Sequence, residues 1–216
     1  MFVSSYNKFP RRPDKYLSYN KVKQVFSDIY KLDNPKEYSI EHIVPQSNFK
    51  DNKLLKCDMH NLLYYPSKLN LHRSNYKYIS DFKLYETSVL LDSLGNKVKF
   101  INKKNDDYSI KTSEKKIFLP PEKYRGSIAR SSMYFLTTYT EFENIILDKV
   151  IDPYTLLTWH HMYPVTDYEK EKELKISECQ GNSNIFIKEP RLLVDYMEDI
   201  LKVNLIFYKD NFFEII

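Results

Sequence analysis

The sequence predicts an α+β fold in which helices and strands share one mixed domain. Apolar residues recur at helical spacing in three separate segments, which is typical of amphipathic helices. Between them lie short runs rich in Ile, Val, Leu and Tyr, bounded by proline or turn residues, which is typical of strands. No internal repeat, low-complexity tract or Pro/Ser-rich linker divides the chain, so we treat residues 1–216 as one domain.

The first third of the chain predicts a helix, two strands and a second helix. Apolar residues over 22–29 follow the i, i+3, i+4, i+7 pattern of an amphipathic helix. Residues 38–44 and 61–65 are strand-like, and a proline follows each run and ends its pairing. We expect the second helix from residue 67 to about residue 76. The order strand, loop, strand, helix predicts a compact unit near the front of the fold.

The rest of the chain predicts a hairpin and then mostly helix. Residues 87–91 and 97–101 flank a turn-forming sequence, with Gly95 expected in the left-handed conformation. The remaining predicted elements are a long helix over residues 128–147, another helix over 192–201 and a strand over 204–208.

Composition excludes several classes of protein. Aromatic residues make up 15% of the chain, which is more surface for burial than disordered chains carry. The longest apolar runs, such as residues 89–91, are far shorter than the roughly 20 residues that span a bilayer. The first ten residues lack the apolar stretch of about 7–15 residues that a secretory signal needs. We therefore expect an intracellular protein with no signal peptide and no transmembrane segment.

Cysteine content and charge set looser limits. Cys57 and Cys179 are the two cysteines, too few for a disulfide scaffold, and no CxxC pair exists to build a zinc finger. We expect two free thiols, although the sequence leaves open whether they pair. The net charge of +4 permits a polyanionic partner without establishing one, because lysine clusters are also ordinary solvated surface.

Side chains capable of catalysis concentrate between residues 41 and 75. Glu41 and His42 are adjacent on the first predicted strand, and Asn70 lies on the helix that follows the second. A strand, a turn, a strand and a helical turn fit between them, so Asn70 can return to bonding distance. Carboxylate and amide oxygens are hard ligands suited to Mg²⁺ or Mn²⁺. A neutral imidazole can accept a proton from water. The combination predicts hydrolysis of a phosphodiester.

Each of these residues also has a structural interpretation. Neighbouring side chains on a strand point to opposite faces, so a Glu-His pair is by itself more often structural. Asn70 alone would be read as a helix cap or a surface residue, and His60 is equally well explained as a core histidine bonded to backbone. We expect His160 and His161 to be packing or surface residues at a helix end. The combination, and no single residue, favours a site.

Six short motifs follow one another along residues 38–190. In order they are EHIVPQS at 41–47, DMHNL at 58–62, NLHRSN at 70–75, RGSIAR at 125–130, the Trp159 and Pro164-Val165 segments with Glu169, and QGNSN at 180–184 with Phe186. Together they resemble the endonuclease I family of nonspecific nucleases, which are of the ββα-metal (His-Me finger) type. Any one motif is weak evidence, but six in order form a specific signal.

The resemblance implies roles for individual residues. It makes His42 the general base that activates water. It makes Glu41 and Asn70 the ligands of a single divalent ion, Mg²⁺ with Mn²⁺ as a substitute. His60 and Asn61 would orient the site through hydrogen bonds. The segment 180–184 would be a structural loop.

The resemblance also implies which residues bind substrate. Arg130, Arg73 and Lys53 are the candidates, although Arg130 is equally well explained as part of a structural ion pair. Some secreted members of the family carry an arginine in a long loop after the histidine strand. Here a shorter loop holds lysines instead, of which Lys53 is one. The ββα-metal motif would occupy about residues 38–78, and a helical remainder about 118–203.

We therefore expect a divalent-metal-dependent, sequence-nonspecific endonuclease that cuts DNA to 5′-phosphate and 3′-hydroxyl ends, with RNA left open as a second substrate. The alternative from another class is a catalytically inactive nucleic-acid-binding protein of the same fold. A sequence-specific HNH-type enzyme is a weaker possibility, because the chain shows no helix-turn-helix or zinc-finger segment to read bases. We infer neither a protein partner nor a membrane partner.

Overall fold

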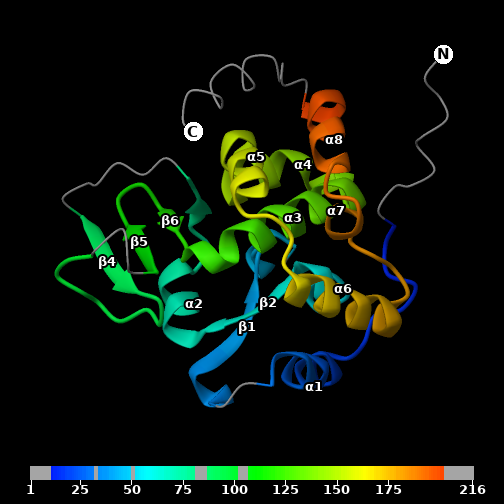
Figure 1. The fold of residues 1–216 in the computed structure, drawn as a ribbon, viewed down its shortest axis with the longest axis horizontal. Helices are drawn as coiled ribbons and strands as arrows, with labels where there is room; N and C mark the ends of the chain where they lie inside the picture. The colour runs from blue at the N-terminus through cyan, green and yellow to red at the C-terminus, as the bar shows by residue number, and fades with distance from the viewer. Residues whose placement is uncertain (1–10, 32–33, 50–51, 81–86, 102–106, 202–216) are drawn as a thin grey trace.

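The computed structural model describes residues 11–31, 34–49, 52–80, 87–101 and 107–201. The fold is α+β, as predicted. A small sheet lies at one side of the molecule and most of the helices lie at the other, with a two-stranded hairpin between them (Figure 1). Within the described ranges, no helix combines the length and the apolar content needed to cross a membrane.

The front of the chain forms the predicted helix, strands and second helix. They are α1 (Tyr19–Tyr30), β1 (Tyr38–His42), β2 (Leu62–Pro66) and α2 (Ser67–Arg73). β1 and β2 pair antiparallel, with His42 opposite Leu62, and α2 contacts both strands. α2 ends three residues earlier than predicted because Ser74 takes a positive φ of 53° while its N–H still bonds Asn70.

Short turns connect these elements. Four 3₁₀ turns cover Pro35–Glu37, Gln46–Asn48, Leu55–Cys57 and Met59–Asn61. The last three lie in the loop between β1 and β2. Lys56 and Asn61 of that loop bond back to His42, Ile43 and Val44, at and just beyond the end of β1.

A four-stranded sheet follows in the order β3-β6-β5-β4. Its strands are β3 (Lys77–Tyr78), β4 (Ser88–Asp92), β5 (Tyr108–Thr112) and β6 (Ile117–Leu119). The predicted turn is present, with Gly95 at φ 88°, but the predicted second strand at 97–101 was wrong. Only Lys97, opposite Leu91, and Val98, whose N–H donates to the Leu90 carbonyl at 3.0 Å, pair back to β4. Phe100 is 77% exposed, and β5 pairs with β4 along the other edge of β4.

Helices make up the rest of the described chain. They are α3 (Glu122–Thr138), α4 (Glu143–Ile145), α5 (Pro153–Met162), α6 (Asp167–Gln180), α7 (Ile185–Lys188) and α8 (Leu192–Leu201). A 3₁₀ turn at Thr140–Phe142 and a π turn at Ile146–Val150 lie between α3 and α5. α8 confirms the predicted helix over 192–201. The strand predicted at 204–208 lies outside the described residues.

The predicted helix over 128–147 was wrong in its extent. α3 begins earlier, directly after Pro121, and ends at Thr138. Tyr139 then leaves the helical conformation, and its hydroxyl donates to the buried carboxylate of Asp58 at 2.7 Å. This bond holds Tyr139 against the loop before β2, at the point where the chain leaves α3.

Two apolar cores hold these layers together. The larger packs α3 and α5 against the four-stranded sheet, around side chains such as Tyr134, Phe135 and Trp159. The smaller joins α1, the loop before β2 and α6. Cys57 and Cys179 both lie at this second core and are free thiols, so they do not pair.

A buried carboxylate links three segments of the fold. Asp58 is fully buried and accepts hydrogen bonds from Tyr134 (2.9 Å), Tyr139 (2.7 Å) and the Gln180 amide (3.0 Å). The Gln180 side chain also accepts the backbone N–H of Met59 at 3.0 Å. These bonds tie the loop before β2 to α3 and to the end of α6, and they give the 180–184 segment a structural role.

We predict that Asp58→Ala lowers the free energy of unfolding by about 3 kcal/mol or more, because each buried donor left without a partner costs about 1–3 kcal/mol. Urea unfolding followed by circular dichroism measures this. Asp28→Ala, an exposed position on α1, should change the same quantity by no more than about 0.5 kcal/mol. A loss at Asp58 as small as that at Asp28 would contradict the structural role of this network.

Candidate active site

The C-terminal end of β1 and one face of α2 form the candidate site. Glu41 and His42 end β1, while Asn70 and Arg73 lie one helical turn apart on α2. Arg73 Nη1 donates to Glu41 Oε1 at 2.7 Å and to the His42 carbonyl at 2.9 Å. Its Nη2 donates to the Ile43 carbonyl at 2.6 Å. These three hydrogen bonds anchor α2 to the end of β1.

Glu41 is an acid held inside the protein. Its side chain is 4% exposed and that of Arg73 is 1% exposed. The pKa of the Glu41 carboxyl lies above its ordinary value, because burial raises it by more than the Arg73 guanidinium and the Tyr78 hydroxyl, which donates to Oε1 at 3.1 Å, lower it. Both of these bonds use Oε1. Oε2 takes part in neither of these two bonds.

His42 points to the other side of the strand and is oriented at both ring nitrogens. Nε2 lies 3.0 Å from the Lys56 carbonyl oxygen, and Nδ1 lies 3.0 Å from the Gln46 amide nitrogen. A carbonyl only accepts, so Nε2 carries the hydrogen and Nδ1 accepts from Gln46. Burial lowers the pKa of His42 to about 4, and the ring is therefore neutral at pH 7. A neutral Nδ1 is the form that can take a proton from water.

Asn70 presents its amide in one orientation. Its Nδ2 donates to Ser39 Oγ at 3.0 Å and to the Ile40 carbonyl at 3.1 Å. With the amino group held against β1, the carbonyl oxygen is left to face away from these two acceptors. An amide oxygen in a fixed direction is a suitable ligand for a hard cation.

These side chains line one cavity of about 370 Å³, which we call the active-site cavity. Glu41, His42 and Asn70 all contribute to its wall, although Glu41 and His42 leave β1 on opposite sides. Ser74 also lines it, with φ 53° and ψ −112°, a conformation that costs a non-glycine residue about 1–3 kcal/mol and that recurs at functional sites.

The donor set suits a hard divalent ion with few protein ligands. No group of three or more His, Cys, Asp or Glu side chains in the described part of the chain is arranged to hold a metal. One carboxylate and one amide oxygen at the active-site cavity are instead the pattern expected for Mg²⁺, which keeps several positions for water and substrate. The residues present therefore fit such an ion.

Comparison with known proteins identifies the family. The model of the family described as Endonuclease I matches residues 4–191. The chain belongs to the endonuclease I family. Among curated proteins, Endonuclease-1 of Buchnera aphidicola subsp. Acyrthosiphon pisum (strain APS) is 33% identical over 139 residues, which cover 64% of this chain and 47% of that protein. The chain thus spans about half the length of the curated relative it matches.

His60 and Asn61, from the motif at residues 58–62, lie behind the site. Asn61 accepts the Val44 N–H at 2.8 Å and donates to the Val44 carbonyl at 3.1 Å, so it fixes the backbone just beyond His42. His60 is buried and faces the opposite way, with Nε2 3.2 Å from the Asn182 carbonyl oxygen and its ring against Tyr134. Asn61 thus braces the site directly, whereas His60 connects it to the 180–184 loop.

The three predicted substrate-binding residues lie in different surroundings. Arg73 lines the active-site cavity but is engaged with Glu41. Arg130 is 1% exposed, forms an ion pair with Glu169 at 2.8 Å and donates to the Tyr163 carbonyl, away from the cavity. Lys53 lines a separate, neighbouring cavity. The structure thus places Arg130 in the structural ion pair that the sequence left open.

Other residues at the site carried weaker sequence signals. Tyr78 bonds Glu41 and its ring lies under the Arg73 guanidinium, 4.4 Å from centroid to Cζ, yet it stands outside the quoted motifs. Gln46 lies within the first motif, but nothing in its residue type indicates a bond to His42.

His160 and His161 occupy the last turn of α5, the helix end at which they were expected.

We predict that the His42 imidazole of the metal-free protein protonates near pH 4, because burial penalises its charged form. NMR titration of the ring resonances measures this, and the same ring in 8 M urea should protonate near its ordinary value of about 6.5. The unfolded state then binds the proton first. The stability that His42 contributes is full above pH 6.5 and is lost as the pH falls from 6.5 to 4. A native ring that titrates near 6.5 would contradict the buried, neutral assignment.

We predict that Arg73→Ala lowers the free energy of unfolding by about 3–5 kcal/mol, because it leaves the buried Glu41 carboxylate without its positive partner. Adding Glu41→Gln to that variant should recover part of the loss, since the neutral amide needs no counter-ion. Urea unfolding provides the measurement. Arg12→Ala breaks an exposed pair with Glu141 and should cost less than about 1 kcal/mol. Strictly additive losses at Glu41 and Arg73 would show that the two do not interact.

Proposed function

We propose that this protein is a divalent-metal-dependent, sequence-nonspecific endonuclease that hydrolyses phosphodiester bonds in DNA. The observation that carries the proposal is that Glu41, His42 and Asn70 line one cavity in a chain with the ordered motifs of the endonuclease I family. The name of the curated relative, Endonuclease-1, supports the same activity. RNA remains open as a second substrate.

Glu41 and Asn70 would hold the divalent ion. We expect Mg²⁺, which Mn²⁺ can replace. A bound divalent ion offsets the negative charge that develops on the phosphate and on the leaving oxygen. Arg73 and Tyr78 keep the Glu41 carboxylate in place through its Oε1, and Ser39 keeps the Asn70 amide turned. This chain's contribution to ion binding is therefore a preset pair of oxygens.

His42 would act as the general base at Nδ1. Its Nε2–H bond to the Lys56 carbonyl sets the tautomer and fixes the ring plane. Proton transfer from water to Nδ1 lets the water oxygen form a bond to phosphorus while the bond to the 3′ oxygen breaks, and the released 3′ oxygen takes a proton from solvent water. The products are a 5′-phosphate and a 3′-hydroxyl. Gln46 bonds Nδ1 in the described structure, so it must yield this position to the attacking water.

Substrate binding would rest on the phosphate backbone and read little sequence. Beside the active-site cavity, and sharing Asn75 with it, lies a cavity of about 320 Å³ that includes Lys77, Lys115, Lys116 and Lys149. A further cavity, which shares Gln46 with the active-site cavity, includes Lys53. Basic side chains thus line two cavities next to the one that holds Glu41 and His42, which suits a polyanionic strand that crosses the site.

The ββα-metal motif would consist of β1, β2 and α2 within residues 38–78, in a single nuclease domain of residues 1–216. Two antiparallel strands followed by a helix that packs on both are the observed arrangement there. This supports the assignment of the His-Me finger type.

We predict that the purified protein nicks supercoiled plasmid in the presence of Mg²⁺ and that His42→Ala loses at least about 10²-fold in rate, the usual range for a general base. Gel electrophoresis of the plasmid over time measures this. His161→Ala, an exposed histidine at the end of α5, should cut at the wild-type rate. Circular dichroism spectra that match the wild type would show that each variant is folded.

Cutting by the wild-type protein that is unchanged by excess EDTA would contradict the metal-dependent mechanism. Binding of DNA with no cleavage across Mg²⁺, Mn²⁺, Ca²⁺ and Zn²⁺ would instead favour the catalytically inactive nucleic-acid-binding protein. Labelling of the new ends with polynucleotide kinase, before and after phosphatase treatment, tests whether the phosphate stays on the 5′ side.

A further inference from the structure

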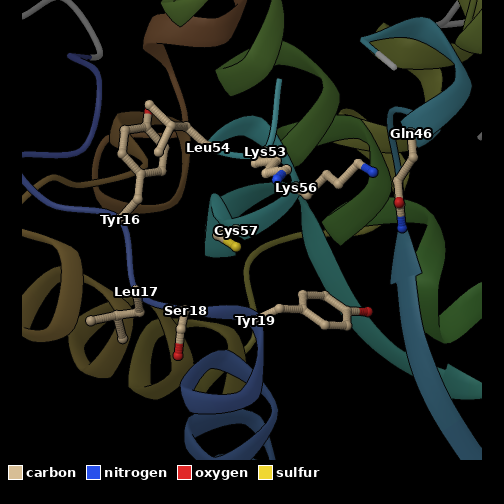
Figure 2. A pocket seen from close by; sticks show the side chains of 9 residues that line it. All are labelled: Tyr16, Leu17, Ser18, Tyr19, Gln46, Lys53, Leu54, Lys56 and Cys57. Atoms are coloured by element: carbon tan, nitrogen blue, oxygen red, sulfur yellow. The ribbon is translucent and has the colours of Figure 1, made fainter. Parts of the chain in front are cut away.

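A larger cavity of about 650 Å³, which we call the side cavity, opens beside the active-site cavity (Figure 2). One wall is formed by residues 16–19, which lead into α1. The other comes from the loop between β1 and β2, with Lys53, Leu54 and Lys56. Figure 2 shows the Tyr19 ring reaching from the start of α1 toward β1, with the two lysines on the loop across from it.

The side cavity is one side chain away from the proposed base. Gln46 lines both cavities and bonds His42 Nδ1. Lys56 lines the side cavity while its carbonyl oxygen accepts from His42 Nε2. The Tyr19 ring lies 6.2 Å from the His42 ring, with the two planes 19° apart. A ligand in the side cavity would therefore lie next to whatever His42 acts on.

The walls combine apolar surface with positive charge. Tyr16, Leu17 and Leu54 supply the apolar part, and Leu54 is 55% exposed, so it has apolar area left to cover. Lys53 and Lys56 supply the charge. In the part of the chain that the structure describes, neither ammonium group forms an ion pair with a carboxylate.

We propose that the side cavity binds one unpaired nucleotide of the substrate strand, next to the linkage that is cut. This inference rests on the proposed nuclease function. The base contacts the apolar wall, and the phosphate that follows it lies near Lys53 and Lys56. A free inorganic anion would not need the apolar wall, and an uncharged ligand would not need the two lysines.

The side cavity is large enough for one nucleotide. Its volume lies within the range of about 300–1,000 Å³ that is typical of small-molecule sites. A base that contacts the apolar wall of Tyr16, Leu17 and Leu54 has left the stack and the pairing of a duplex. Single-stranded segments are therefore the substrates that use this cavity.

The test measures binding with EDTA present, so that no cleavage occurs. Fluorescence anisotropy compares two labelled probes with the same number of phosphates, a thymidine hexanucleotide and a hexamer of abasic sugar-phosphates. The wild-type protein should bind the thymidine probe about tenfold more tightly, as expected for contacts to a base. Leu54→Ala should reduce that preference to about threefold or less, because it removes apolar wall.

Two further variants separate the contributions of wall and charge. Lys53→Ala should weaken the binding of both probes alike and leave the preference for bases unchanged. It should also reduce the slope of the logarithm of the binding constant against the logarithm of the salt concentration by about one. Leu174→Ala is the matched control, because Leu174 is 56% exposed on α6 and outside the side cavity. It should leave both affinities unchanged.

Equal affinity of the wild-type protein for the two probes, no measurable binding of the thymidine probe, or an unchanged preference in Leu54→Ala would each overturn the inference. The outcome is independent of the plasmid assay. A protein that cuts plasmid but shows no preference for bases refutes the nucleotide cavity alone. A protein that prefers bases but never cuts refutes the proposed nuclease activity and retains the cavity.

Discussion

The buried pair of Glu41 and Arg73 holds the site in shape. A carboxylate that is taken out of water must be matched by a positive charge and by hydrogen bonds, and Arg73 supplies both from α2. The same guanidinium also bonds the carbonyl oxygens of His42 and Ile43, so it closes off the backbone where β1 ends. Once α2 is fixed in this way, Asn70, one turn earlier, must lie beside β1.

A second, separate set of contacts holds the histidine. The loop after β1 returns so that the Lys56 carbonyl meets Nε2 and Gln46 meets Nδ1. Asn61 clamps Val44, and Asp58, three residues before Asn61, is bonded to Tyr134 and Tyr139 near the end of α3. Acid and base are thus positioned by different parts of the fold, which explains how adjacent strand residues with opposite directions serve one cavity.

The sequence predicted the parts of the fold that rest on local patterns. The apolar stripe over 22–29 identified α1, proline placement bounded β1 and β2, and the motif order brought Glu41, His42 and Asn70 together in the prediction. Contacts between distant segments account for the rest. β4 pairs with β5 along one edge and with only Lys97 and Val98 of the predicted strand along the other, and α3 ends before Tyr139, whose hydroxyl donates to Asp58. α5 and α6 lie in the predicted helical remainder, but the bounds of neither were predicted, because α5 is buried around much of its circumference and the buried face of α6 carries charged side chains. Neither helix shows an apolar stripe.

The most direct measurement is the binding of Mn²⁺ to the folded protein, followed by electron paramagnetic resonance without any nucleic acid. We expect one site per chain, and we expect Glu41→Gln and Asn70→Ala each to weaken it at least about tenfold, because a hard ion held by few protein ligands depends on each of them. Asn144→Ala, a matched amide on α4 outside the active-site cavity, should bind as the wild type does. A single Mn²⁺ site that neither substitution weakens would show that Glu41 and Asn70 do not share an ion.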